Sequence, residues 1–199
     1  MRTSDPSAQT LDLPEADLLF YPGFFAPEES DRLFALLREG TSWKQETIRL
    51  FGKPIPQPRL IAWHGEPGAN YTYSGLTVHP EPWTEPLLRI KARVEPVAGA
   101  VFNSVLLNLY RSERDSVSWH ADDEPELGHN PTIASVSFGA TRRFGLRHKE
   151  QRDRRHTLDL RHGSLLLMRG ATQHHWQHQI PKSAKPCGER INLTFRVIR

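Results

Sequence analysis

Polar and apolar residues alternate through the final segment of the chain, "RINLTFRVIR". Between Arg190 and Arg196 every second residue is polar, and the residues between them are Ile, Leu and Phe. Because successive side chains of a strand point to opposite faces, this pattern predicts a strand with one face in an apolar core. Two environments suit the polar face. It faces water, as in many half-buried strands, or it binds a small anion through the forked donors of its arginines.

Two amphipathic helices are predicted in the first half of the chain. Residues 26–40 combine early acidic residues, apolar residues at helical spacing and a terminal glycine, which are start and stop signals of a helix. A second helix is predicted over Pro86–Val97, and the Gly- and Pro-rich region from Phe51 to Tyr73 is expected to be mostly loop. A short strand and turn is predicted at "DLLFYPGFF", before the first helix.

After Phe102 the pattern changes to short strands separated by turn signals. The predicted strands are "SVLLNLY", "TIASVSFG", "RRFGLRHK", "HTLDL", "SLLLM", "HHWQHQI" and the closing strand. Many short strands favour a barrel or a sandwich, and two preceding helices suffice to cover one sheet. We therefore expect an α+β protein with a double-stranded β-helix, the cupin-like jelly roll, and N-terminal helices packed on one sheet.

The domain organisation follows from these elements. Residues 1–13 are expected to be a flexible tail, and residues 14–199 a single domain. Within it, residues 14–101 supply helices and recognition loops, and residues 102–199 form the jelly-roll core. A monomer is the expected state.

Composition narrows the setting of the protein. Cys187 is the only cysteine among 199 residues, which excludes an internal disulfide and a four-thiolate zinc site. No apolar run is long enough to span a bilayer, and the first residues lack the apolar stretch of a secretory signal, so no membrane association and a cytoplasmic location are expected.

Net charge is only +3, but its distribution is uneven. Residues 142–161 contain eight Lys or Arg against three acidic residues. Such a cluster indicates either a surface that meets phosphates or a solvated basic hairpin, and charge alone does not choose between them.

Candidate metal ligands occur in two segments of the strand region. His120 and Asp122 are two residues apart, so in an extended segment both point the same way. Downstream, "TQHHWQHQIP" offers His174, His175 and His178. Two histidines and one carboxylate form the arrangement that holds Fe(II) and leaves positions open for substrate and oxygen. Zinc binding and a plain histidine-rich surface use the same residues, and spacing does not separate the three interpretations.

The polar face of the closing strand suits an Fe(II) oxygenase that consumes a dicarboxylic 2-oxo acid. One end of such a co-substrate chelates the metal, and the buried carboxylate at the other end needs a cationic partner. Residues 190–196 supply two arginines for it, and Asn108 and Tyr110 in "NLY" supply further donors on one face of their strand.

The chain also resembles the AlkB family of Fe(II)- and 2-oxoglutarate-dependent nucleic-acid dealkylases. The resemblance rests on "NLY", "HADDE", "ASVSFGA", "HGSLLLM", "HWQHQIP" and "RINLTFR", with "LFGK" and "YTYSGLT" upstream, and covers about residues 45–198. It looks closest to the branch that repairs duplex DNA.

The resemblance implies a role for each of these positions. It makes His120, Asp122 and His178 the catalytic iron ligands. It assigns the 2-oxoglutarate pocket to Asn108, Tyr110, Arg190, Asn192, Thr194 and Arg196. Within that pocket Arg190 is expected at the distal carboxylate, and Arg196 at the end near the metal, where it also braces Asp122.

The activity implied is oxidative dealkylation of N-alkylated bases in DNA, such as 1-methyladenine and 3-methylcytosine. It uses Fe(II), 2-oxoglutarate and O2 and releases formaldehyde, succinate and CO2. The same chemistry on RNA or on a protein side chain is the alternative within enzymes. A nucleic-acid-binding barrel without catalysis is the alternative outside them, although such a binder has no reason to keep the complete ligand set.

Substrate contacts are also carried over from the resemblance. Phe51 at a loop tip is expected to wedge into the base stack, Tyr73 to stack on the flipped base, and Asp123 and Glu124 to lie near it. Ordinary packing and a solvated turn are the plain alternatives. One departure concerns "PKSAKPCGE", where the duplex-acting branch has a compact basic triplet, so single-stranded DNA remains an open substrate.

Overall fold

The computed structural model describes residues 8–50, 53–69, 71–73 and 76–199. Its helices are α1 (Pro27–Gly40), α2 (Glu85–Ala98), α3 (Thr172–His175) and a 3-10 turn at Pro125–Leu127. The first strands are β1 (Gln9–Thr10), β2 (Asp17–Tyr21), β3 (Thr47–Leu50), β4 (Lys53–Pro56), β5 (Leu60–Gly65), β6 (Tyr71–Tyr73) and β7 (Leu76–Val78). The later strands are β8 (Ser104–Tyr110), β9 (Val117–His120), β10 (Ile133–Gly139), β11 (Arg142–His148), β12 (Arg155–Leu160), β13 (Ser164–Arg169), β14 (Trp176–Ile180) and β15 (Arg190–Arg196).

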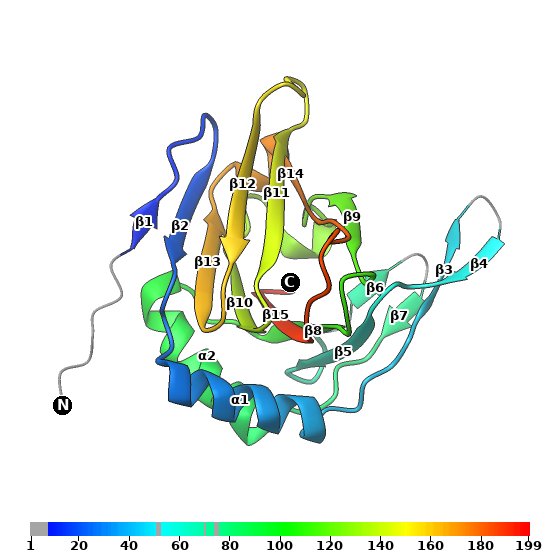
Figure 1. Cartoon of the computed structure of the whole chain (residues 1–199). Helices are drawn as coiled ribbons and strands as arrows, with labels where there is room; N and C mark the ends of the chain where they lie inside the picture. The colour runs from blue at the N-terminus through cyan, green and yellow to red at the C-terminus, as the bar shows by residue number, and fades with distance from the viewer. Residues whose placement is uncertain (1–7, 51–52, 70, 74–75) are drawn as a thin grey trace.

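Two antiparallel sheets form the centre of the molecule. The larger has the order β1-β2-β13-β10-β15-β8-β5, and the smaller has the order β12-β11-β14-β9. Figure 1 shows α1 and α2 lying together along the larger sheet, with the smaller sheet on the other side of the barrel. The predicted jelly roll with helices on one sheet is confirmed.

The closing strand β15 lies in the middle of the larger sheet, between β10 and β8. Ile191, Leu193 and Phe195 belong to an apolar cluster that also contains Leu33 of α1 and Ile90 of α2. The four polar side chains that alternate with them therefore point into the barrel, and all four are buried. Their exposed fractions are 1% for Arg190, 8% for Asn192, 7% for Thr194 and 4% for Arg196. The polar face of this strand does not look at water.

A second apolar cluster fills the rest of the space between the sheets. It includes Phe20 of β2, Phe144 of β11, Leu166 of β13 and Trp176 of β14. The packed interior holds the two sheets at a defined distance and register. Polar side chains that point into the barrel are thereby held in fixed positions.

The region expected to be mostly loop contains three strands. β4, β5 and β6 all lie within residues 51–73, and β5 extends the larger sheet by pairing with β8 from Leu60 to Gly65. The expectation gave the Gly and Pro residues too much weight, because "LIAWHG" carries enough apolar and β-favouring residues for an edge strand. β3 and β4 form a hairpin that projects from the side of the barrel, next to β6 and β7 (Figure 1).

Two further predictions need correction. The predicted strand "HHWQHQI" begins with α3, which includes His174 and His175, so β14 starts only at Trp176. Within the stretch expected to be a flexible tail, β1 pairs with β2, and Leu11 and Leu13 pack against the cluster between the sheets. Apolar contacts order these residues. Over the ranges that the structure describes, no helix has both the length and the apolarity to cross a membrane.

Candidate functional site

His120, Asp122 and His178 come together between neighbouring strands of the smaller sheet. His120 ends β9 and is the register partner of His178 in β14, while Asp122 lies in the turn after β9. One ligand atom from each of the three lies within 4.8 Å of the others. Asp122 and His178 are 2% and 6% exposed. The strand pairing therefore brings His178, and not His174 or His175, next to His120.

The protonation states of this group suit a divalent metal. His120 Nδ1 lies 2.8 Å from Ser118 O, so this nitrogen carries the proton and donates it, which leaves the lone pair on Nε2. Burial and the neighbouring His120 lower the pKa of His178 to about 3, so this imidazole is neutral at neutral pH. Its 3.8 Å contact with Asp122 is accordingly not an ion pair there. Neutral imidazoles are the form that binds a metal ion.

Asp122 is held by two further residues. Arg196 Nη2 donates to Asp122 Oδ1 at 2.6 Å, and the backbone N–H of Asp122 donates to Gln173 Oε1 at 2.9 Å. Burial alone would raise the pKa of Asp122, but the charge and hydrogen bond of Arg196 outweigh it and keep that pKa below its ordinary value. The carboxylate is therefore ionised, and its orientation is fixed from both the larger sheet and α3.

A cavity between the sheets joins this group to the polar face of β15. Its volume is about 60 Å³, several times the roughly 10–15 Å³ that one water molecule requires. Its polar lining consists of Arg59, Asn108, Tyr110, His120, Asp122, Ser135, His178, Arg190, Asn192, Thr194 and Arg196. Its apolar lining consists of Leu106, Val117, Phe144, Leu160, Met168 and Ile180. Three arginines against one carboxylate make the cavity suitable for an anion.

Arg190 presents a buried guanidinium with free donors to this cavity. Nη2 donates to Ser137 Oγ at 2.9 Å, and the guanidinium carbon lies 5.1 Å from the centre of the Tyr110 ring. Nε and Nη1 have no hydrogen-bond partner among the residues that the structure describes. Burial lowers the pKa of Arg190 to about 10, so it stays charged at neutral pH. A buried cation with two free donors fits an anionic ligand at this end.

Other polar residues of the cavity bond mainly to each other. The Nδ2 group of Asn192 donates to Ser135 Oγ at 2.8 Å and to Val136 O at 3.0 Å, and Thr194 Oγ1 donates to Asn192 Oδ1 at 3.2 Å. Asn108 Oδ1 accepts from Arg59 Nε at 2.7 Å. Asn192 thus holds the strands together, while Arg59 is a cavity residue that the sequence did not indicate.

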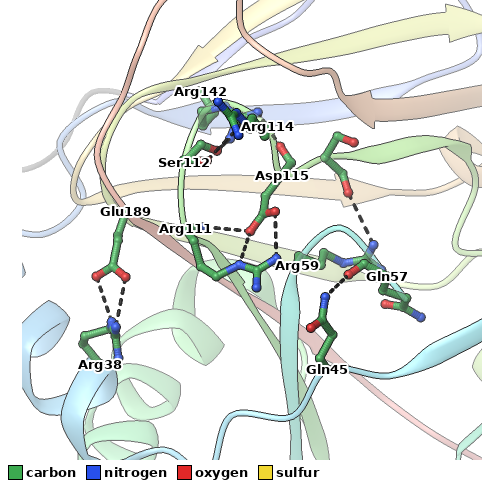
Figure 2. Close-up of polar contacts among 11 residues, drawn as sticks. Arg38, Gln45, Gln57, Arg59, Arg111, Ser112, Arg114, Asp115, Arg142 and Glu189 are labelled. Atoms are coloured by element: carbon green, nitrogen blue, oxygen red, sulfur yellow. Dashed lines mark hydrogen bonds and ion pairs between the residues drawn. The ribbon is translucent and has the colours of Figure 1, made fainter. Parts of the chain in front are cut away.

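The turn from β8 to β9 is braced by a second polar network, which Figure 2 shows. Arg111 binds both carboxylate oxygens of Asp115 across this turn, at 2.7 and 3.0 Å. The buried Arg142 donates to Ser112 O at 3.2 Å and to Asp115 O at 2.8 Å, and its guanidinium carbon lies 5.5 Å from the Tyr110 ring centre. This network holds in place the strand that carries His120.

The structure describes the side chains of only some of the residues expected to contact the substrate. Asp123 is half-exposed next to Asp122, and Lys149 Nζ lies 2.8 Å from its Oδ2. Glu124 precedes the 3-10 turn and has one side-chain oxygen buried. Tyr73 ends β6, but its side chain lies outside the described part of the structure, as does all of Phe51.

Glu15, His148 and His175 form a second cluster with ligand-type atoms within 4.8 Å of one another. His148 Nδ1 accepts hydrogen bonds from the backbone N–H groups of Glu150 and Gln151, so its proton is on Nε2, 3.0 Å from Glu15 Oε2. A metal would need that Nε2 lone pair. The cluster is therefore a hydrogen-bonded anchor for the N-terminal segment.

Comparison with known proteins agrees with this geometry. The profile of the 2OG-Fe(II) oxygenase superfamily matches residues 17–196. Human "Alpha-ketoglutarate-dependent dioxygenase alkB homolog 3" is 47% identical over 187 residues, which are 89% of this chain and 65% of that protein. "DNA oxidative demethylase ALKBH2" of Mus musculus is 41% identical over 188 residues, which are 89% of this chain and 79% of that protein.

The comparison with solved structures concerns the fold. A solved structure of OsALKBH1 superposes with a TM-score of 0.64 and 16% sequence identity, and the match covers 96% of this chain and all of that one. This likeness supports the jelly-roll fold alone. The chain spans just under two thirds of the length of the human relative. On the profile match and the identities above, the chain belongs to the 2OG-Fe(II) oxygenase superfamily and, within it, to the AlkB family.

Proposed function

We propose that this protein removes alkyl groups oxidatively from N-alkylated bases in DNA, such as 1-methyladenine and 3-methylcytosine. The observation that carries the proposal is a single cavity with two imidazoles and a carboxylate at one end and the free donors of Arg190 at the other. Relatives named as a dioxygenase of the alkB type and as a DNA oxidative demethylase support the same reaction class.

The residues fit Fe(II) and 2-oxoglutarate by their chemistry. His120, Asp122 and His178 are proposed to hold the iron, because two histidines and one carboxylate suit Fe(II) and leave positions for other ligands. The distal carboxylate of 2-oxoglutarate is proposed to take the two free donors of Arg190. Asn108, Tyr110, Asn192, Thr194 and Arg196 complete the proposed co-substrate pocket.

Bound iron, with 2-oxoglutarate and O2, supplies the hydroxylating chemistry that converts the N-methyl group to an unstable N-hydroxymethyl group, with succinate, CO2 and finally formaldehyde as products. The protein positions the reactants and keeps water away. Arg196 keeps Asp122 ionised and oriented. His120 donates its Nδ1–H to Ser118 O, which leaves Nε2 as the nitrogen that would bind the metal. The apolar lining excludes solvent. It includes Phe144, whose ring stacks on His178 with 5.2 Å between the ring centres.

Substrate recognition is proposed to use the residues around the mouth of this cavity. Asp123 and Glu124 are proposed to lie beside the damaged base, Tyr73 to stack on it and Phe51 to fill the gap in the base stack. The basic β11–β12 hairpin has exposed arginines at Arg143, Arg152, Arg154 and Arg155, which suit phosphates.

The testing experiment uses anaerobically purified protein with Fe(II), 2-oxoglutarate and ascorbate. It receives air together with single- or double-stranded oligonucleotides that carry one 1-methyladenine or 3-methylcytosine, and mass spectrometry records loss of the methyl group. We expect the loss to require 2-oxoglutarate and to disappear in His120→Ala, but not in the control His174→Ala.

The outcomes separate the substrate from the chemistry. If the metal-bound protein removes the methyl group from methylated RNA but from none of the DNA oligonucleotides, the substrate is RNA and not DNA. Phe51→Ala is expected to slow demethylation of duplex DNA more than of single strands, and an equal effect on both would contradict the wedge role.

A further inference from the structure

Asp123 and Lys149 form an ion pair between solvent and the proposed metal ligands His120, Asp122 and His178. Lys149 Nζ lies 2.8 Å from Asp123 Oδ2, with side chains 29% and 49% exposed. Lys149 directly follows β11, and its backbone N–H donates to His175 O at 2.7 Å. That hydrogen bond fixes the backbone from which the lysine side chain extends. The pair therefore has a defined position beside Asp122.

The two adjacent carboxylates of this turn are in different states. Asp122 is buried, and its Oδ1 is occupied by Arg196. Asp123 has only Oδ2 occupied, by Lys149, and Oδ1 accepts no hydrogen bond from the part of the chain that the structure describes. Asp123 thus keeps one oxygen for a donor that approaches from solvent, but its negative charge is shared with an ammonium group.

We propose that Lys149 is a specificity-determining residue that sets the balance between cationic and neutral damaged bases by partly neutralising Asp123. The inference rests on the proposed function and deepens it. Methylation at N1 of adenine or N3 of cytosine creates a cationic base with an exocyclic amino donor. Methylation at N1 of guanine or N3 of thymine leaves a neutral base that has a carbonyl oxygen, O6 or O4, at the position of that amino group.

The charges of the pair act in opposite directions on these two classes. The Asp123 carboxylate attracts a cationic base, and its free Oδ1 suits the amino donor. The Lys149 ammonium repels the same cation, whereas it is a suitable donor for a carbonyl oxygen of a neutral base. Lys149 therefore lowers selectivity for the cationic class and extends acceptance to the neutral class.

Two substitutions should move the selectivity in opposite directions. Lys149→Met removes the ammonium and should raise the preference for the cationic base by about threefold, the scale of an exposed ion pair. Asp123→Asn removes the carboxylate and should lower that preference. In the Asp123→Asn background, Lys149→Met should raise the preference less than it does alone, because the shielded charge is gone.

The test measures binding without turnover. Protein with Mn(II) and 2-oxoglutarate, without O2, is titrated into fluorescent single-stranded oligonucleotides of one sequence that carry 1-methyladenine, 1-methylguanine or no methyl group. The quantity compared is the ratio of the dissociation constants for the two methylated oligonucleotides. A loss of attraction to phosphates affects both equally and cancels in this ratio. The matched control is Arg152→Met, an exposed cation on the same hairpin.

The expected result is a ratio shifted toward 1-methyladenine in Lys149→Met, unshifted in Arg152→Met and near wild type in Lys149→Arg. An unshifted ratio in Lys149→Met, or a shift toward 1-methylguanine, overturns the role of Lys149 and leaves the proposed function standing. The proposed function, and the role of Lys149 with it, is overturned if the wild-type protein binds methylated and unmethylated strands equally and demethylates neither of the two methylated strands.

Discussion

Arg196 and Asp122 form a buried ion pair that joins the two sheets of the barrel. Arg196 Nη2 lies 2.6 Å from Asp122 Oδ1, and the residues are 4% and 2% exposed. Arg196 ends β15 of the larger sheet, whereas Asp122 follows β9 of the smaller one. The contact therefore links the proposed co-substrate strand to the proposed metal ligands, and several measurable consequences follow from this part of the molecule.

Removal of Arg196 should destabilise the metal-free protein strongly. Arg196→Met takes from Asp122 the charge that offsets its burial, and we expect the free energy of unfolding to fall by about 3–5 kcal/mol. Urea denaturation measures it. Arg38→Met, which breaks an ion pair whose arginine side chain is 42% exposed, should cost about 1 kcal/mol or less. A similar loss in both variants would contradict the importance assigned to burial.

Metal affinity should depend on only one of the three clustered histidines. His178→Ala should abolish Co(II) or Fe(II) binding, because it removes one of the three proposed ligands. His174→Ala and His175→Ala should retain it, because their rings contact His129 and His148 instead. Co(II) absorption and calorimetric titration provide the measurement. Retained affinity in His178→Ala would refute the assignment of this ligand.

The role of Arg190 should appear as discrimination between two 2-oxo acids. Arg190→Met should weaken binding of 2-oxoglutarate to the Mn(II) protein by about 10–100-fold, the scale of a charge-assisted hydrogen bond. Binding of 2-oxobutyrate, which has no distal carboxylate, should change little. Calorimetric titration with both acids measures the difference. Equal losses for the two acids would indicate a general disruption of the cavity and not a carboxylate contact.

Gln173 should act as a positioning residue for Asp122. Gln173→Leu removes the oxygen that accepts the Asp122 backbone N–H, and we expect metal affinity to fall by about 10–100-fold, as for other residues that orient ligands. Gln173→Glu keeps an acceptor oxygen and should retain most of the affinity. The control is Gln177→Leu, because the Gln177 side chain accepts a hydrogen bond from Arg147 on β11 and none from Asp122. An unchanged metal dissociation constant in Gln173→Leu would exclude this role.

The metal-free protein should lose stability as the pH falls below about 6.5. The pKa of His178 is lowered to about 3 in the folded state, so between these values the unfolded state binds the additional proton. Stability should fall with decreasing pH by up to about 1.4 kcal/mol per pH unit from this group. The lowered pKa of Asp122 adds a loss in the same direction below its ordinary range.

Urea denaturation between pH 7 and pH 4.5, from about half a unit above to about two units below the ordinary His pKa of about 6.5, tests this expectation. His178→Phe should have a shallower slope than wild type. Leu167→Ala removes a buried side chain from the apolar cluster that contains Ile191 of β15 and Leu33 of α1, and should lower stability by about 2–5 kcal/mol at every pH without altering the slope. An identical slope in wild type and His178→Phe would show that His178 does not titrate as described.

The strands and helices around the site were predictable because their signals are local. Alternation in residues 190–196 predicts burial of one strand face, and the observed bounds of β15 and β8 match the predicted strands "RINLTFR" and "SVLLNLY". The two helices were predicted within one or two residues at each end, from apolar spacing and terminal residues. The resemblance also placed His120, Asp122 and His178 in one group, which the structure brings within 4.8 Å.

Other features were missed because their local signal was weak or absent. The apolar and β-favouring residues of β5 were outweighed by the Gly and Pro residues around them, and its partner β8 is distant in sequence. Arg59 and Gln173 are ordinary polar residues in the sequence, and their contacts with Asn108 and Asp122 span 49 and 51 positions. Ser135 and Ser137 do alternate within "ASVSFGA", so that pattern was available as a signal for their inward face.

The sequence by itself determined the class of fold, the two helices, most strands of the barrel and the residue types that suit iron and a dicarboxylate. These properties depend on periodicity and on the chemistry of short motifs, which neighbouring residues carry. Only the tertiary structure decided that the polar face of β15 points into the barrel, that Gln173 accepts the backbone N–H of Asp122, and that Lys149 contacts one oxygen of Asp123. Those relationships depend on which strands pair and in which register, and strand pairing is a contact between distant residues that no local pattern contains.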